Sequence, residues 1–167
     1  MITFATTDLC DAHEAALESG ELQVMAPGLR SFGLRASFAG PARTLKLFED
    51  NPLLAETVRT PAAGRVLVVD AGGSLRRAVL GGNLAKAAEA NGWAGLVIAG
   101  AIRDVGEVAT CNLGVLALGV NPRRSAKRGE GERDVAVAVQ GARVVPGMWI
   151  YVDADGVLVS PRPLHAA

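Results

Sequence analysis

The pattern of hydrophobic and polar residues along the chain predicts an α/β protein. Three apolar runs, at 65–70, 95–100 and 114–120, consist almost entirely of valine, leucine, isoleucine, alanine and glycine. Such runs are typical of strands that are covered on both faces. A helical pattern lies within 75–90, and a shorter one follows the second run through Val108. The middle of the chain is therefore predicted as strand, helix, strand, helix, strand.

Shorter elements are predicted on either side of this unit. Residues 6–8 are suited to cap an amphipathic helix of about three turns, whose apolar positions run from Leu9 to Leu17. Two short strands are expected between Phe32 and Phe48, and Asn51 followed by Pro52 predicts the start of another helix. The tail predicts four short strands, over 135–139, 142–145, 149–152 and 157–159, with a hairpin at Asp155-Gly156.

Gly81 and Gly82 interrupt the helical pattern of 75–90. Two adjacent glycines cost about 2 kcal/mol relative to alanine in a helix interior. We therefore predict a loop at this pair and a helix from about Asn83 to Asn91. The chain has 20 glycines, more than the average usage of about 7%, so many tight turns and close backbone approaches are expected.

Length and charge narrow the class of protein. The 167 residues fit one domain, 1–167. The chain has 17 basic and 17 acidic residues and only 4% aromatic residues, which argues against direct nucleic-acid binding, because such binders normally carry a basic surplus and stacking side chains. With half of its residues hydrophobic, the chain is not predicted to be disordered.

The predicted compartment is the cytoplasm. Cys10 and Cys111 fit neither a disulfide framework nor a zinc spacing, and we expect both to be small buried hydrophobes. Met1–Glu21 lacks the basic residue and the apolar core of a signal peptide. No apolar run approaches the 18 or so residues of a membrane span, so no membrane association is expected.

The charges are unevenly distributed. The first 21 residues contain five acidic and no basic residues, whereas 122–133 contains five basic residues and two acidic ones. One interpretation is two solvated surface segments. The other is that the two segments meet across a subunit interface, where opposite potentials fix the register.

Two features that suggest chemistry are weak. The strand at 66–70 followed by Gly72-Gly73 resembles the entry to a phosphate-binding loop, but neither G-x-G-x-x-G nor G-K-[ST] follows. His13 and His165 have no partners at the spacing of a metal site or a catalytic triad. A structural turn and two surface or capping histidines are the expected outcomes.

A stronger constellation joins the ends of two predicted strands. Ligands of α/β sheets bind beyond the carboxyl ends of strands, often at a helix N-terminus. The segment 81–84 opens a helix there with amides that few side chains cover, and Arg103-Asp104 follows the strand at 95–100. An arginine can hold an anionic substrate while the carboxylate holds a hard cation. Glu107 is close to the same helical face. A surface ion-pair cluster is the alternative.

These residues carry a resemblance to a known family. Gly82, twenty residues, Arg103-Asp104, two residues and Glu107 reproduce the G-x20-R-D-x2-E/D signature of class II pyruvate aldolases. The chain resembles the 4-hydroxy-4-methyl-2-oxoglutarate (HMG) and 4-carboxy-4-hydroxy-2-oxoadipate aldolases, which share a fold with the regulator of ribonuclease activity A (RraA). The resemblance also covers 30–40, 48–51, 69–76, 121–125 and 131–135.

The resemblance implies a fold and an assembly. The family fold is a layered β/β/α swivelling domain of the phosphohistidine-domain type, and members form homotrimers or hexamers. Longer aldolases of the family carry C-terminal acidic residues that reach a neighbouring subunit's site, whereas this chain ends soon after Val159.

The resemblance also implies roles for the signature residues. Backbone amides of the loop at 81–84, together with the arginine, would hold the carboxylate or keto group of a pyruvate-type substrate. The aspartate would bind Mg²⁺ or Mn²⁺, partly through waters, and the glutamate would support the metal site or position a base and would not itself be a direct ligand. The candidate catalytic residues are Arg103, Asp104 and Glu107, the metal ligand is Asp104, and the substrate-binding residues are Gly81, Gly82, Asn83, Leu84 and Arg103.

The implied activity is metal-dependent retro-aldol cleavage of HMG to two pyruvates, with oxaloacetate decarboxylation through the same enolate. The alternative is a non-enzymatic regulator that binds a ribonuclease E-type endonuclease or a helicase, which needs no Arg-Asp pair. A third hypothesis, a methyltransferase of menaquinone synthesis, is rejected because the chain has no glycine-rich nucleoside loop followed by an acidic ribose ligand.

Overall fold

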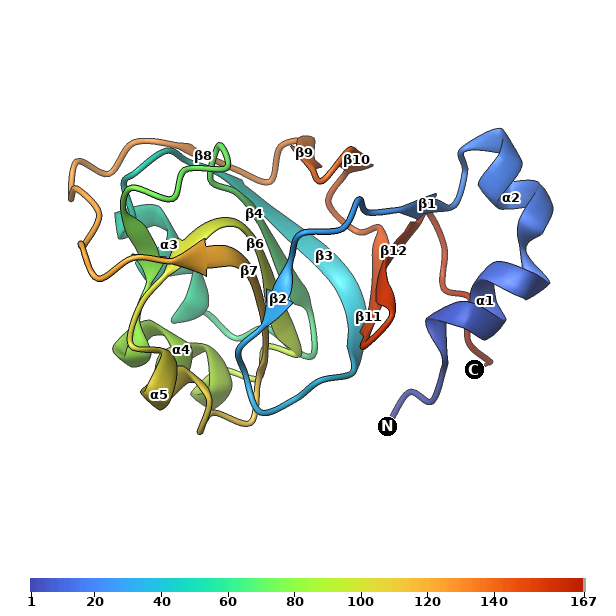
Figure 1. Ribbon diagram of the computed structural model, residues 1–167, viewed down its shortest axis with the longest axis horizontal. Helices are drawn as coiled ribbons and strands as arrows, with labels where there is room; N and C mark the ends of the chain where they lie inside the picture. The colour runs from blue at the N-terminus through green and yellow to red at the C-terminus, as the bar shows by residue number, and fades with distance from the viewer. Residues whose placement is uncertain (167) are drawn as a thin grey trace.

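Four parallel strands form the centre of the fold (Figure 1). They lie in the order β3 (Phe38–Lys46), β4 (Val66–Asp70), β6 (Gly95–Ile102) and β7 (Gly114–Val120). The computed structural model describes residues 1–166. Every residue of β6 is buried, as its unbroken apolar sequence predicts, because both faces of the sheet are covered.

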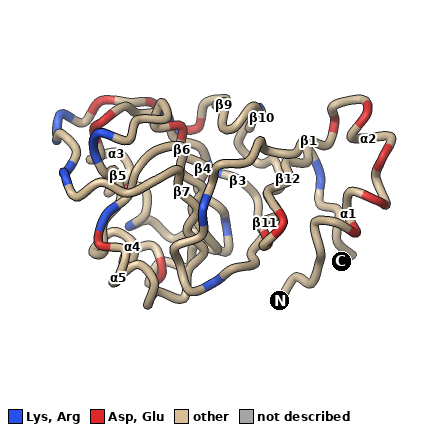
Figure 2. The backbone as a smooth tube through the Cα atoms, in the orientation of Figure 1, with Lys and Arg blue, Asp and Glu red and all other residues tan. Residues whose placement is uncertain are grey.

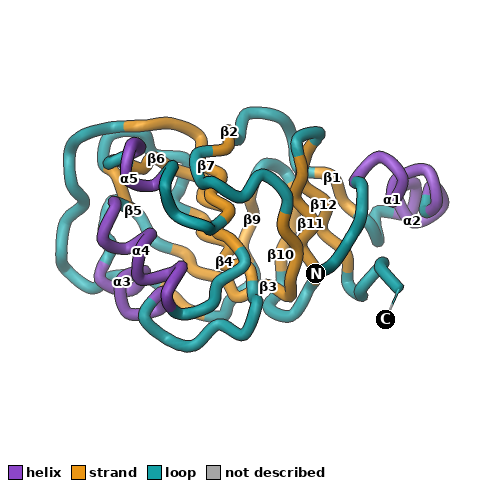
Figure 3. Tube along the Cα trace, turned by 90° about the horizontal axis from the view of Figure 1, so that it is seen from below, coloured by secondary structure: helices purple, strands orange, loops and turns teal. Residues whose placement is uncertain are grey.

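Helices cover one face of this sheet. α3 (Pro52–Val58), α4 (Gly82–Ala90) and α5 (Val105–Val108) lie together on that side (Figure 3). The strand side chains that point toward them alternate along the sequence, as the pleat of a strand requires. The resulting core contains Leu67, Val69, Leu96 and Ile98 from the strands and Leu54, Val58, Ala85 and Ala88 from the helices.

The C-terminal strands cover the other face. They are β9 (Val137–Val139), β10 (Ala142–Val144), β11 (Trp149–Asp153) and β12 (Gly156–Ser160). The sheet curls, because β11 pairs with the edge of β3 and also shares a core with the central strands. This second core joins Val66, Val68 and Val97 to Val137, Val139, Val144, Ile150, Val152, Val157 and Val159.

Four short strands complete the sheet. β1 (Gln23–Val24) pairs with β12, and β2 (Arg30–Ser31) pairs with β7. β5 (Ala78–Leu80) runs parallel to the end of β6, and β8 (Glu132–Arg133) pairs with β3. The helical pattern expected from residue 75 is therefore wrong before the glycine pair, where the chain forms β5. The two strands expected between Phe32 and Phe48 are one continuous strand, β3.

The N-terminal helix differs from its prediction. The chain forms two short helices, α1 (Thr6–Ala12) and α2 (Glu14–Ser19), because it leaves helical geometry at His13. Residues 6–8 do not supply a side-chain cap. The cap comes from Asp153, whose carboxylate accepts hydrogen bonds from the N–H and the hydroxyl of Thr6, both at 2.7 Å.

The predicted starts of α3 and α4 are confirmed, with one difference of detail. Pro52 is the first residue of α3, but Asn51 makes no side-chain capping bond; its amide donates to the Val79 carbonyl at 3.1 Å. α4 begins at Gly82, so the glycine pair lies at the helix start, where it does not carry the penalty of a helix interior.

The two charged segments lie at opposite ends of the molecule (Figure 2). The acidic residues of α1 and α2 gather at one end, and the basic segment that follows β7 lies at the other. Of the two cysteines, Cys111 is buried as predicted, whereas Cys10 is half-buried. Within residues 1–166, no helix combines the length and the apolar character that crossing a membrane requires.

Candidate functional site

A pocket of about 280 Å³ opens beyond the carboxyl ends of β5 and β6, at the N-terminus of α4. This is where the topology of α/β proteins places ligands. Four segments that are far apart in the sequence meet there. The lining residues are Asn51, Ala55, Arg59, Ala78, Leu80, Gly81, Asn83, Leu84, Arg103, Asp104, Arg124 and Lys127.

The geometry of the strand ends explains the spacing of the signature. β5 and β6 are paired, and the Arg103 N–H donates to the Leu80 carbonyl at 2.9 Å. The residues that follow the two strands are therefore neighbours. The Gly82 N–H donates to Oδ2 of Asp104 at 2.9 Å, so the aspartate caps α4 from the adjacent strand end. The backbone of Asp104 is in the left-handed helical region, with φ 54° and ψ 41°.

The glycine pair is required by close approach. A Cβ atom on Gly82 would lie 3.0 Å from the Cβ and 2.8 Å from the Cδ of Glu107, and one on Gly81 would lie 2.8 Å from Oδ2 of Asp104. Glu107 does not line the pocket; it forms an ion pair with Lys86 at 3.1 Å. The role of the glutamate stays a prediction.

The start of α4 offers two free donors. Among residues 1–166, the backbone N–H groups of Asn83 and Leu84 donate to no protein acceptor. The first turn of a helix carries unpaired N–H groups and the positive end of the helix dipole, which together favour an anion. The Gly82 N–H is already bonded to Asp104, so this one amide of the expected cradle at 81–84 is not available to a ligand.

The pocket carries a surplus of positive charge. Arg59, Arg103, Arg124 and Lys127 line it against the single carboxylate of Asp104. Within the described part of the chain, none of these four cations takes part in an ion pair. Cations that no protein carboxylate neutralises raise the local concentration of anions. The pocket is therefore suited to a ligand with more than one negative charge.

The donor set of the pocket limits the metal it can hold. Residues 1–166 contain no group of three or more His, Cys, Asp or Glu side chains arranged to hold a metal ion. Asp104 offers Oδ1 to a cation, since Oδ2 accepts from Gly82. One carboxylate suits Mg²⁺ or a similar hard ion, which keeps several waters and takes few protein ligands, and does not suit zinc.

Sequence reasoning missed part of the pocket. Asn51, Arg59, Arg124 and Lys127 were not among the expected site residues. The basic residues after Pro122 were visible as a charge run, but no sequence pattern specifies where in the fold this segment lies. The predicted residues Gly81, Asn83, Leu84, Arg103 and Asp104 do line one pocket.

The fold and the pocket define a class: an α/β protein with a positively charged pocket between a helix N-terminus and an Arg-Asp pair. Comparison with known proteins identifies the family. The profile of the RraA-like family, described as Aldolase/RraA, matches residues 6–159. This chain belongs to the RraA-like family.

Curated relatives cover almost the whole chain. A protein of Burkholderia multivorans named "Putative 4-hydroxy-4-methyl-2-oxoglutarate aldolase" is 59% identical over 163 residues, which are 98% of this chain and 99% of the relative. A protein of the same name from Burkholderia mallei is 62% identical over 161 residues, 96% of this chain and 98% of the relative.

Two solved structures share the fold throughout. The RNA-processing inhibitor RraA from Thermus thermophilis superposes with a TM-score of 0.90 at 46% identity, over 97% of this chain and 95% of that one. A structure from Geobacillus kaustophilus, titled as an S-adenosylmethionine: 2-dimethylmenaquinone methyltransferase, has a TM-score of 0.90 at 43% identity, over 96% and 97%. The expected mixed α/β fold is thereby confirmed as the RraA fold; its assignment to the swivelling-domain class stays a prediction.

Proposed function

We propose that this protein is a lyase that cleaves 4-hydroxy-4-methyl-2-oxoglutarate to two molecules of pyruvate. The observation that carries this proposal is the meeting of Arg103, Asp104 and the free amides of Asn83 and Leu84 in one positively charged pocket. The names of the curated relatives support the same reaction. We also propose oxaloacetate decarboxylation as a side activity, since it forms the same pyruvate enolate.

The chain's own residues bind the 2-oxo acid end of the substrate. The Arg103 guanidinium and the two free amides hold the carboxylate or keto group by charge-assisted hydrogen bonds. Donors fixed in this way stabilise the enolate more than the ground state, because negative charge grows on the C2 oxygen as the bond breaks. The hydrogen bond from the Gly82 N–H fixes the side-chain carboxylate of Asp104 beside the bound 2-oxo acid end of the substrate.

The bond that breaks joins C3 to C4 of the substrate. A water held near Arg103 takes the proton of the C4 hydroxyl, the C4 oxygen forms a carbonyl, and the electron pair of the C3–C4 bond becomes the enolate. Protonation at C3 gives one pyruvate, and the C4 fragment is the other. A divalent cation, Mg²⁺ or Mn²⁺, would be held by Asp104 and would supply Lewis-acid stabilisation of the developing charge.

A pyruvate-release assay tests the proposal. Purified protein is incubated with HMG or oxaloacetate and Mg²⁺ or Mn²⁺, and pyruvate is followed through lactate dehydrogenase. We expect turnover that EDTA abolishes and added metal restores. Absence of pyruvate from both substrates would overturn the proposal, as would an Asp104→Ala variant with wild-type activity.

A regulator of ribonucleases is the second candidate function. The observation in its favour is the match to the Thermus thermophilis inhibitor. In this proposal the protein surface binds a ribonuclease E-type endonuclease or a helicase, and the pocket has no part. Capture of such an enzyme by the native protein, with slowed RNA cleavage that Asp104→Asn leaves unchanged, would support it. Unchanged cleavage at saturating protein would contradict it.

We also propose that the protein forms a homotrimer or hexamer and that it acts in the cytoplasm. The acidic and basic ends are then available to face each other between neighbouring copies (Figure 2). Sedimentation of the purified protein at low and high salt tests this, because a contact between opposite potentials weakens as salt screens it.

A further inference from the structure

The basic segment that follows β7 brings two cations to the pocket that the proposed reaction does not use. Arg124 and Lys127 line the same cavity as Arg103, although they come from a separate part of the chain. Their neighbours in the segment, Arg123 and Arg128, do not line it. Of these four cations, only Arg124 and Lys127 therefore line the pocket.

The fold holds the near end of this segment firmly. Ser125 is buried, and its hydroxyl donates to the Ala78 carbonyl at 2.8 Å. The Ala126 N–H donates to the Glu49 carbonyl at 2.8 Å. Asp50 is also buried, and its two carboxylate oxygens accept from the N–H groups of Arg128, at 2.7 Å, and of Glu130. A buried carboxylate thus holds the backbone of a basic segment.

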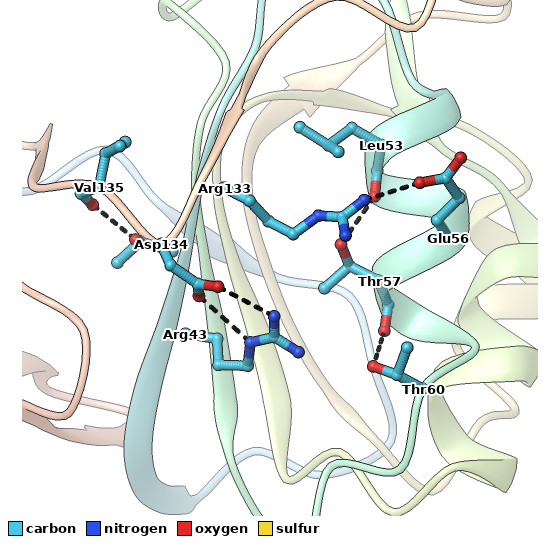
Figure 4. Close-up of polar contacts among 9 residues, drawn as sticks. Arg43, Leu53, Glu56, Thr57, Thr60, Arg133, Asp134 and Val135 are labelled. Carbon is cyan, nitrogen blue, oxygen red and sulfur yellow. Dashed lines mark hydrogen bonds and ion pairs between the residues drawn. The ribbon is translucent and has the colours of Figure 1, made fainter.

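Two ion pairs hold the far end of the segment (Figure 4). Arg133 binds Glu56 of α3 at 2.6 Å, and Asp134 accepts from Arg43 of β3 at 3.1 and 3.3 Å. The close-up shows these residues joining the returning chain to the helix layer and to the sheet. Both ends are fixed, so the backbone that carries the cations is ordered before any ligand arrives, which lowers the entropic cost of binding.

The two cations have no carboxylate partner in the described part of the chain. Nζ of Lys127 donates to Oδ1 of Asn51 at 3.3 Å, and Arg124 takes part in no ion pair. Arg59 lines the pocket too, from α3, and its guanidinium donates to the Ala55 carbonyl of its own helix. Arg124 and Lys127 are therefore two cations without a carboxylate partner that one segment of the chain brings to the pocket beside Arg103.

We propose that Arg124 and Lys127 form a second anion subsite, which binds the distal carboxylate of a 2-oxo dicarboxylate. The proposal thus names the residues that select, within the proposed reaction, a 2-oxo acid with a second carboxylate at the far end of a short chain. Asp50 is the positioning residue of the subsite. The inference takes the location of the 2-oxo end from the proposed function, but the subsite can be tested by binding alone.

The test compares two unreactive ligands that differ only at the far end. 2-Oxoglutarate carries a carboxylate where 2-oxopentanoate carries a methyl group. Calorimetry with Mg²⁺ present is expected to give about 10- to 100-fold tighter binding of 2-oxoglutarate by the wild type, the range of a hydrogen bond to a charged group. Equal affinities would overturn the subsite.

Substitutions test which side chains cause the preference for 2-oxoglutarate over 2-oxopentanoate. Lys127→Met and Arg124→Gln should each weaken 2-oxoglutarate binding about tenfold and leave 2-oxopentanoate unchanged, whereas Lys127→Arg should keep most of the preference. Arg123→Gln is the matched control: it removes one charge from the same segment outside the pocket, and it should change neither affinity. Equal loss of both ligands in the Lys127 and Arg124 variants, or an equal effect of Arg123→Gln, would refute the assignment.

Asp50→Asn tests the positioning residue. The amide presents one acceptor where two backbone N–H groups require two, so the preference for 2-oxoglutarate should fall while 2-oxopentanoate binds as before. An unchanged preference would remove Asp50 from the subsite. Failure of the aldolase proposal is seen separately, as absence of pyruvate release. If the protein prefers 2-oxoglutarate but releases no pyruvate, the subsite proposal stands and the aldolase proposal fails. If it releases pyruvate but shows no such preference, the aldolase proposal stands and the subsite proposal fails.

Discussion

Asp104 combines a structural and a chemical role, and a series of substitutions separates them. Its left-handed backbone costs a residue such as alanine about 1–2 kcal/mol, whereas asparagine and glycine tolerate it. Its hydrogen bond from the Gly82 N–H is worth about 1 kcal/mol, because the side chain is largely in solvent. Alanine loses both contributions, glycine loses the hydrogen bond, and asparagine retains an acceptor.

The expected losses in unfolding free energy follow from these terms. Asp104→Ala should lose about 2–3 kcal/mol, Asp104→Gly about 1 kcal/mol and Asp104→Asn less than that. With a urea slope of about 2 kcal/mol/M, the alanine variant should unfold about 1–1.5 M earlier than the wild type. Urea titrations followed by the fluorescence of Trp93 and Trp149, at one protomer concentration, measure the series.

The same variants are then assayed for pyruvate release. Asp104→Asn should be nearly as stable as the wild type but inactive, since a neutral amide is a poor ligand for a hard cation. Equal midpoints for the alanine and glycine variants would refute the backbone argument. Equal midpoints for alanine and asparagine would refute both structural terms. An active asparagine variant would refute the chemical role.

Two further predictions follow from other contacts. Gly82→Ala should displace Glu107 and lower activity at least tenfold, whereas Gly106→Ala, where an added Cβ meets nothing within 4 Å, should change neither activity nor melting temperature. Partial burial opposes the charge of Asp153, but the hydrogen bonds from Thr6 and the nearby backbone outweigh it and lower the pKa below the ordinary 3.8. A carboxylate whose pKa is lower in the folded than in the unfolded protein stabilises the fold at pH values above the unfolded pKa, and this stabilisation is lost as the pH falls through the folded pKa. The wild type's stability advantage over Asp153→Asn should therefore shrink below about pH 4. An advantage that stays constant with pH would contradict this.

Much of the fold could be predicted because its elements are locally specified. The strands β4, β6 and β7 were found from unbroken apolar runs, which require cover on both faces. The start of α3 was found from Asn51-Pro52 and that of α4 from its glycine pair. In each case the residues that specify the element lie within it or beside it.

The errors occurred where distant residues decide the local structure. β5 has only three residues and exists because the end of β6 offers it a partner. α1 takes its cap from Asp153, which is 147 residues away. No window of the sequence contains either contact, so local patterns predicted helical residues before the glycine pair in one place and a self-capped helix in the other.

By itself, the sequence determined the class of fold, the signature of Gly82, Arg103, Asp104 and Glu107, and the family resemblance, because apolar periodicity and residue spacing are properties of the chain. Tertiary structure alone decided that Arg124 and Lys127 join Arg103 and Asp104 of that signature in one pocket. The physical reason is that a charge run is compatible with any solvated surface. Its location depends on the buried carboxylate of Asp50, which orders the basic segment over the pocket through hydrogen bonds formed only in the folded chain.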